Sequence, residues 1–207
     1  MRPDHQPACV AAVVFDFDGT LTRPGEIDFA GIRRELGCPV GTPILEYVHN
    51  LPGDRADPES VLDRYEMEAA ERAEPNVGAE DLVLALVEHG LPLAILTRNM
   101  RRAVVRSLEN FPRLGPEHFV AMIARDDDIR PKPDPEGIFR LASMLRVSVP
   151  SILCVGDYDF DVEIARRAGC LSAFLTNGQA MTTTHPDYTI DRLDEVLAIV
   201  VGDACNH

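Results

Sequence analysis

Two aspartates spaced two residues apart are the residues of this sequence best placed to do chemistry. Asp16 and Asp18 follow an apolar run that begins at Cys9, and Gly19 after them permits a sharp turn. Taken alone, such acids could simply form a turn that closes a strand. However, the pattern DxDGT arises by chance in roughly one chain of this length in 400. A metal-ligating or catalytic acid pair is therefore the stronger interpretation.

Further polar side chains follow later apolar runs. Each of them, taken alone, has a plainer interpretation as a helix cap, a surface lysine or a loop acid. Their shared position beyond successive strand-like runs favours a functional role. They are Thr97, Arg98 and Asn99 beyond the second run, Lys132 in a proline-flanked loop beyond the third, and Asp157 and Asp161 beyond the fourth. By contrast, the run Asp126-Asp127-Asp128 is expected to be a solvated charge run.

Alternating apolar runs and helical patterns predict the elements that must position these side chains. Continuous apolar runs are typical of strands buried on both faces, and they span residues 9–15, 91–96, 119–123, 151–155 and 171–175. Helical patterns span residues 79–88, 101–108, 135–145, 161–168 and 193–200. This alternation predicts an α/β, Rossmann-like parallel sheet with helices on both faces. Because ligands bind beyond the carboxyl ends of parallel strands, the polar side chains should converge there.

The segment from residue 22 to residue 76 breaks the alternation. It contains six prolines, and three amphipathic helices are expected at residues 28–36, 43–51 and 59–74, the last of them largely solvated. We therefore predict an α/β core formed by residues 1–21 and 77–207, with residues 22–76 as a small all-helical insertion. Its candidate pocket residues, each expected mainly at the surface, are Arg23, Glu26, Arg33, Arg34 and His49.

Composition and charge exclude several classes of protein. The formal net charge is −14, which disfavours nucleic-acid binding because phosphate backbones require clustered Lys and Arg. No apolar run approaches the ~20 residues of a membrane span, and no secretory signal pattern precedes the first strand. Cytoplasmic residence without membrane attachment is expected. The five cysteines show no zinc-ligand spacing, and those in apolar runs, Cys9 and Cys154, are expected to be buried thiols.

This set of motifs resembles that of the haloacid dehalogenase-like hydrolase superfamily along essentially the whole chain. Asp16-x-Asp18-Gly19-Thr20 is similar to the first motif of the superfamily. Thr97 matches the second motif, Lys132 the third, and Asp157 with Asp161 the fourth. The segment 22–76 lies where such proteins insert a cap, and it is similar to a short version of the all-helical cap.

The resemblance implies a magnesium-dependent phosphatase that acts on a small phosphorylated metabolite, either phosphoglycolate-like or a sugar phosphate. Mg²⁺ prefers oxygen ligands, which the carboxylates of Asp16 and Asp157 and the backbone carbonyl of Asp18 could supply. Asp16 would attack phosphorus to form a phosphoaspartyl intermediate, and Asp18 would act as general acid and base.

The remaining motif residues would bind or support the phosphoryl group. Thr97, Lys132 and a free backbone amide of Asn99 would contact its oxygens. Asp161 would hold Lys132 or a metal-bound water, Gly19 would support the turn, and Arg98 would face either substrate or solvent.

Other functions remain open from the sequence alone. A dehalogenase is disfavoured because relatives that perform that chemistry lack the acid corresponding to Asp18. A sugar-phosphate mutase would need a cap that excludes water, and this insertion of about 55 residues is small. A receiver-like signalling module also uses a phosphorylated aspartate, but that aspartate ends a middle strand. The oligomeric state, monomer or homodimer, is not determined.

Overall fold

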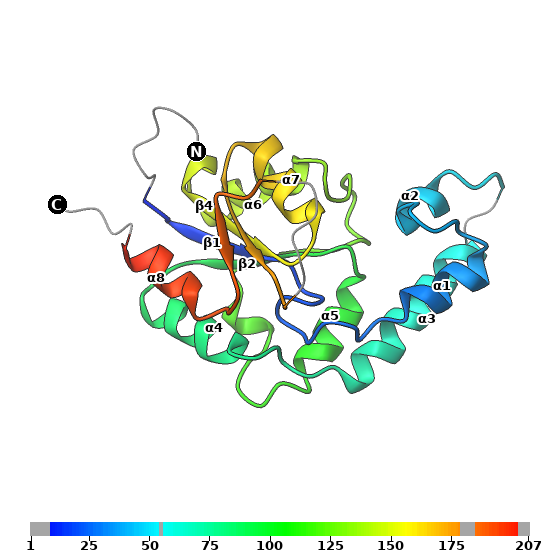
Figure 1. Cartoon of the computed structure of the whole chain (residues 1–207), viewed down its shortest axis with the longest axis horizontal. Helices are drawn as coiled ribbons and strands as arrows, with labels where there is room; N and C mark the ends of the chain where they lie inside the picture. Colours follow the sequence, from blue (N-terminus) through cyan, green and yellow to red (C-terminus); the bar gives the residue numbers. More distant parts are fainter. Residues whose placement is uncertain (1–8, 54–55, 179–184, 203–207) are drawn as a thin grey trace.

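A six-stranded, wholly parallel sheet forms the centre of the computed structural model, which describes residues 9–53, 56–178 and 185–202 (Figure 1). The strands lie in the order β3-β2-β1-β4-β5-β6, so the first strand is central and the chain winds outward from it in both directions. The strands are β1 (Ala12–Phe15), β2 (Leu93–Leu96), β3 (Ala121–Ile123), β4 (Ile152–Gly156), β5 (Leu171–Leu175) and β6 (Tyr188–Ile190). The sheet confirms the predicted α/β class.

Helices cover both faces of this sheet. On the lower face in Figure 1 lie α4 (Ala79–Glu88), α5 (Arg101–Leu108) and α8 (Glu195–Gly202). The opposite face carries α6 (Glu136–Leu145) and α7 (Asp159–Ala168). Short 3₁₀ turns at Pro116–His118 and Val149–Ser151 precede β3 and β4.

Alternation along each strand divides the apolar side chains between two cores. In β1, Val13 and Phe15 join the cluster beneath α4, α5 and α8, whereas Ala12 and Val14 join the cluster beneath α6 and α7. All four are at most 2% exposed. Burial on both faces fixes the register of the strand, because a slip by one residue would exchange every side chain between the two cores. The carboxyl end of each strand is therefore held in one place.

The structure corrects two predictions about the strands. The first strand begins at Ala12 and not at residue 9, so Cys9 precedes the strand and is exposed, whereas Cys154 is buried as predicted. The edge strand β6 was not predicted. It has three residues, of which Thr189 is exposed, and so it lacks the continuous apolar pattern that marks the inner strands.

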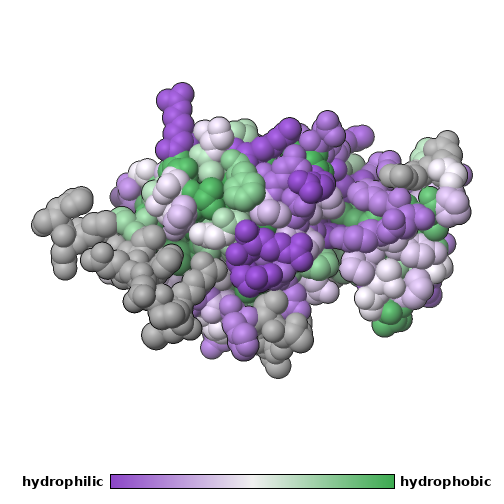
Figure 2. All heavy atoms as spheres, turned by 90° about the horizontal axis from the view of Figure 1, so that it is seen from above, coloured by the Kyte–Doolittle hydropathy of each residue, from purple (hydrophilic) through white to green (hydrophobic). Residues whose placement is uncertain are grey.

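Between β1 and α4 the chain forms three helices that lie beyond the carboxyl ends of the strands (Figure 1). They are α1 (Phe29–Leu36), α2 (Ile44–His49) and α3 (Ala56–Arg72), and they share a small apolar cluster of their own. The segments that leave and re-enter the sheet meet in an isolated antiparallel bridge between Thr22 and Pro75. On the face seen in Figure 2, hydrophilic side chains gather where this helical segment meets the α/β body.

No helix among the described residues is both long enough and apolar enough to cross a lipid bilayer.

β4 lies between β1 and β5, and all five of its residues are buried, so its side chains should contribute strongly to the stability of the core. We expect Leu153→Ala to lower the free energy of unfolding by about 2–5 kcal/mol, since Leu153 is fully buried and truncation leaves a cavity. Met144→Ala on the exposed side of α6 is the control, with an expected change within about 0.5 kcal/mol. Chemical denaturation measures both values, and equal losses would contradict this account of the core.

Candidate functional site

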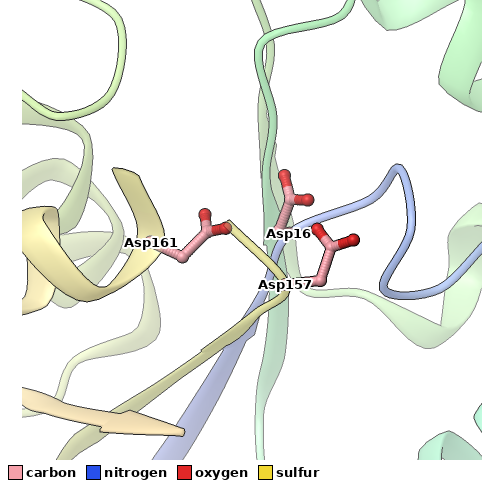
Figure 3. Close-up of side chains that lie close together, drawn as sticks. All are labelled: Asp16, Asp157 and Asp161. Carbon is pink, nitrogen blue, oxygen red and sulfur yellow. The ribbon is translucent and has the colours of Figure 1, made fainter. Parts of the chain in front are cut away.

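Three carboxylates meet where β1 and β4 end, as Figure 3 shows. Asp16 follows β1, Asp157 follows β4, and Asp161 lies in the first turn of α7. One oxygen from each lies within 4.8 Å of the other two. The backbone amide of Asp16 donates to the carbonyl of Val155 at 2.8 Å, so the strand pairing extends to the first acid of the cluster. The convergence predicted from the sequence is present.

Mutual repulsion and burial make ionisation of this cluster unfavourable. Burial, followed by the charge of Asp16, raises the pKa of Asp157 to about 7. Burial also raises the pKa of Asp161 to about 6, although Lys132 opposes the shift. Both carboxyl groups therefore bind a proton more tightly than a free aspartate does.

Lys132 is the cation within this cluster, and its side chain is 4% exposed. Its Nζ donates to Asp16 Oδ1 and, at 2.7 Å, to Asp161 Oδ1. Burial by itself would lower the pKa of Lys132, but the charges of the two aspartates outweigh it and the pKa is raised. The other oxygen of Asp161 accepts from the backbone amide of Tyr158 at 3.2 Å. Both oxygens of Asp161 are thus engaged, which suits it to hold Lys132.

Asp18 lies beside the cluster and is fixed by an amide side chain. Asn99 Nδ2, beyond the end of β2, donates to Asp18 Oδ2. Burial, then the charges of Asp16 and Glu66, raise the pKa of Asp18 well above its usual value. The raised pKa favours the protonated form of Asp18 more than in a free aspartate, and one of its oxygens is held by a neutral donor.

The glycine of the first motif allows Asp157 to approach the loop closely. Gly19 has φ +75°, a left-handed conformation, and a Cβ at this position would overlap the Asp157 carboxylate. Both the backbone conformation and the lack of space require glycine here. Asn177, two residues beyond β5, donates from Nδ2 to Asp157 Oδ2 at 3.2 Å and to the Gly19 carbonyl at 2.7 Å.

The residues beyond β2 are arranged differently from the sequence-based expectation. Thr97 is 5% exposed, and its hydroxyl oxygen accepts from the backbone amide of Asn99 at 3.1 Å. The Asn99 amide, expected to be free, is therefore engaged, and its side chain contacts Asp18. The Thr97 hydroxyl still has a proton to donate, because it acts as an acceptor in this bond.

Arg98, whose side chain is 19% exposed, pairs with the helical segment and not with the carboxylate cluster. Its guanidinium forms a two-pronged ion pair with Glu46 of α2, at 3.0 and 2.6 Å, and donates to the Lys132 carbonyl. It also lies 4.6 Å from the centre of the Phe160 ring. Burial opposes ionisation of Glu46, but the bonds from Arg98 prevail and its pKa is lowered.

A second acid of the helical segment, Glu66 in α3, also reaches the core. It accepts from the backbone amide of Met100 at 2.7 Å and from Arg125 Nε at 3.1 Å. Glu66 is 6% exposed, so this acid lies on the buried face of a helix that is otherwise largely solvated, as expected. Burial raises the pKa of Glu66, and Arg125 offsets only part of the shift.

The acidic run at residues 126–128 is mostly exposed, as expected, but two of its acids also make structural contacts. Asp126 accepts from the backbone amide of Arg101 at the start of α5. Asp127 accepts from the Ala124 amide at 2.8 Å and pairs with Arg101 at 2.6 Å. Asp128 is exposed, as expected for a charge run.

Sequence reasoning missed three residues that meet the site: Glu46, Glu66 and Asn177. It named other residues of the helical segment as candidates and expected each of them mainly at the surface, and Arg23, Arg34 and His49 are exposed. For Asn177 a signal was present, because Thr176-Asn177-Gly178 is a turn pattern directly beyond the fifth predicted strand. The two glutamates carried no such signal, since nothing in a charged amphipathic helix shows which acid faces a partner.

Comparison with known proteins agrees with the fold. A family profile described as haloacid dehalogenase-like hydrolase matches residues 26–175. The chain is 26% identical to pyrophosphatase PpaX of Bacillus velezensis, over 92% of this chain and 96% of that protein. It is 24% identical to a phosphoglycolate phosphatase of Pectobacterium atrosepticum, over 96% and 95% of the two chains.

A crystal structure of a hydrolase from Pseudomonas syringae superposes with a TM-score of 0.76 at 18% identity, covering 94% of this chain and all of that one. This likeness supports the fold, and the profile match extends over most of the chain. The protein therefore belongs to the haloacid dehalogenase-like hydrolase family.

Proposed function

We propose that this protein is a magnesium-dependent phosphatase that hydrolyses a small phosphate monoester through a phosphoaspartyl intermediate on Asp16. The observation that carries the proposal is the contact of Asp16 with Lys132 within a cluster of three carboxylates, beside the protonation-prone Asp18. Relatives named as phosphatases of different substrates support the reaction class, but they do not agree on one substrate.

The donor set of the cluster suits Mg²⁺. Hard divalent cations prefer carboxylate oxygens. The pKa of Asp157 is raised first by burial and then by the charge of Asp16, and a bound cation would favour the ionised form of this carboxylate. Asp16, Asp157 and the backbone carbonyl of Asp18 would hold the ion, with Asp161 engaged instead by Lys132. When bound, Mg²⁺ supplies positive charge that offsets the repulsion between an anionic phosphate and an anionic nucleophile.

The side chains of the protein would divide the reaction into two displacements. Asp16 attacks phosphorus, and the Lys132 ammonium and the Thr97 hydroxyl donate to the phosphoryl oxygens as negative charge gathers on them. Asp18 gives its proton to the departing oxygen and then removes a proton from the attacking water. The hydrogen bond from Asn99 to one oxygen of Asp18 leaves its other oxygen for this transfer.

Residues 22–76 are proposed to act as a cap over this site. Their entry and exit meet at the Thr22–Pro75 bridge, as expected for an insertion into the α/β core. Two polar contacts connect them with the core beside the site: Glu46 with Arg98, and Glu66 with Arg125 and the start of α5. A small cap accommodates a small phosphorylated metabolite, phosphoglycolate-like or a sugar phosphate.

Mutase and receiver functions remain as the alternatives, and no observed contact favours either of them. A mutase would convert one phosphorylated isomer into another without releasing phosphate. Assaying phosphate release together with isomer formation distinguishes the two reactions. A receiver would be phosphorylated without sustained turnover.

Replacing the proposed nucleophile should abolish turnover. We expect Asp16→Asn to reduce phosphate release from a panel of phosphometabolites by at least about 10³-fold in the presence of Mg²⁺, because the amide cannot attack phosphorus. Asp128→Asn, at an exposed position in the segment that follows β3, is the control and should retain full activity. Equal rates for wild type and Asp16→Asn would refute the proposed mechanism.

The pKa shifts predict how stabilisation by magnesium depends on pH. Raised pKa values of about 7 for Asp157 and about 6 for Asp161 mean that the metal-free folded chain binds more protons than the unfolded chain between about pH 4 and pH 7. Their contribution to stability is full below about pH 4 and is lost as the pH rises through 6 to 7. A cation that binds the ionised carboxylates offsets this loss.

We therefore expect the rise in Tm caused by Mg²⁺ to be larger at pH 8 than at pH 5.5, as measured by differential scanning fluorimetry with and without the ion. Asp157→Asn removes one proposed ligand and should abolish most of the shift at both values. An equal shift at pH 5.5 and pH 8 would count against binding at these carboxylates.

The ion pair between the cap and the core should contribute to turnover. We expect Glu46→Gln to lower kcat/KM about fivefold, equivalent to about 1 kcal/mol, while Tm changes little because the pair is partly solvated. A double-mutant cycle with Arg98→Met tests the coupling. Glu68→Gln in α3 is the control, since its partner Arg64 also belongs to the helical segment. Additive effects of Glu46→Gln and Arg98→Met would show that the contact is not used.

A further inference from the structure

Two asparagine side chains donate hydrogen bonds to the loop that carries the first motif, Asp16 to Thr20. Neither asparagine belongs to the motifs recognised in the sequence. Asn177 follows β5, and Asn76 lies where the chain returns from the helical segment to α4. Asn76 Nδ2 donates to Asn177 Oδ1 at 3.3 Å, which joins residues that are 101 positions apart. We call Asn76 and Asn177 the amide pair.

The amide pair holds both sides of the loop against Asp157. Asn177 Nδ2 donates to the Gly19 carbonyl at 2.7 Å and to Asp157 Oδ2 at 3.2 Å. Asn76 Nδ2 contacts the carbonyls of Gly19 and Thr20 at 3.2 and 3.1 Å. One carboxylate oxygen and two loop carbonyls are therefore tied to a single hydrogen-bonded unit.

The backbone of Asn177 adopts a left-handed conformation, with φ +48°. Within the described part of the chain, Arg146 is the one other non-glycine residue with a positive φ. Glycine would adopt this conformation without strain, and asparagine tolerates it better than most residues. The position thus carries a side chain where a glycine would suffice for the turn, and the amide of that side chain contacts Asp157.

The chemistry of an amide suits a place beside a metal-binding carboxylate. A lysine or arginine in the place of Asn177 would orient Asp157 but would repel a cation, whereas an amide donates a hydrogen bond without a charge. Fixing one oxygen of Asp157 restricts rotation of the carboxylate, which otherwise must be ordered when the metal binds. Because Gly19 has no side chain, the carboxylate packs directly against the loop that carries Asp16.

We propose that Asn177, supported by Asn76, is a positioning residue that fixes the Asp157 carboxylate against the Asp16–Gly19 loop and thereby preorganises the Mg²⁺ site. This inference rests on the magnesium dependence in the proposed function. It adds the end of β5 to the ends of β1, β2, β3 and β4, which are followed by the other residues of the site. Through Asn76, it also connects Asp157, the proposed metal ligand, with the point where the chain returns from the helical segment to α4.

The test measures Mg²⁺ binding to the metal-free protein by isothermal titration calorimetry, together with the Tm of each variant without and with Mg²⁺. Asn177→Gly keeps the left-handed backbone and removes only the amide. We expect its Kd for Mg²⁺ to rise about 10- to 100-fold, the range typical when a residue that orients a metal ligand is removed. Phosphate release at saturating Mg²⁺ should recover most of the wild-type rate, with the activation curve displaced to higher Mg²⁺ concentration.

Arg146→Gly is the matched control, because it makes the same change at the other left-handed position, the exposed end of α6. It should leave the Kd for Mg²⁺ unchanged. Asn76→Ala should weaken binding in the same direction but less, since Asn177 retains its own contact with Asp157. If Asn177→Gly does not fold, Asn177→Ser, which is too short to reach both acceptors, takes its place.

The outcomes distinguish the two proposals. If wild type binds no Mg²⁺, the proposed function fails and the positioning role fails with it. If wild type binds Mg²⁺ and Asn177→Gly binds it with the same Kd, only the positioning role is overturned, even where the Tm of the metal-free variant is lower. A purely structural role of Asn177 predicts this second result.

Discussion

The repulsion among buried carboxylates at one edge of the sheet is the constraint on which the rest of the site depends. Asp16, Asp157 and Asp161 lie within 4.8 Å of one another, with Asp18 nearby and Lys132 as the counter-charge within the cluster. Left to themselves, such groups would separate or take up protons. The parallel ladder prevents separation, because Asp16 is hydrogen-bonded to β4 and the strands below it are buried on both faces. The fold thus holds these acids together at the place where the proposed cation would bind.

Neutral donors orient these acids without removing the charge. Asn99 holds one oxygen of Asp18, and Asn177 holds one oxygen of Asp157. An arginine or lysine at either position would weaken the binding of a cation, because its own positive charge would neutralise the acid. Lys132 is the exception, and it is shared between Asp16 and Asp161, so that a single ammonium group serves two carboxylates. This distribution of donors leaves the cluster negative as a whole, which suits a site for a divalent ion.

The helical segment meets the core through the packing of α3 against α5 and through two pairs between a glutamate and an arginine. Glu46 and Glu66 both pair with arginines that directly follow or lie near the ends of core strands, Arg98 and Arg125. The Arg98–Glu46 pair is partly solvated and contributes little net stability, whereas the Arg125–Glu66 pair is almost wholly buried and would be costly to break by removing one partner. Glu66 also adds negative potential near Asp18, and in this way the segment influences the acid that the core supplies.

The sequence by itself determined the parallel α/β core, the insertion after the first strand and the convergence of Asp16, Asp157 and Lys132. Patterns of burial along strands and helices are local, and the carboxyl ends of parallel strands must share one edge. Only the tertiary structure decided which partners the polar side chains take. Arg98 pairs with Glu46, and the backbone amide of Asn99 donates to the Thr97 hydroxyl. Asn177 donates to Asp157 from beyond the end of β5, where the sequence carried only a turn signal. The short edge strand β6 was likewise missed, because one solvated face removes the continuous apolar run. Such contacts join residues far apart in the chain, and hydrogen-bond partners depend on the direction of each side chain, which no local periodicity encodes.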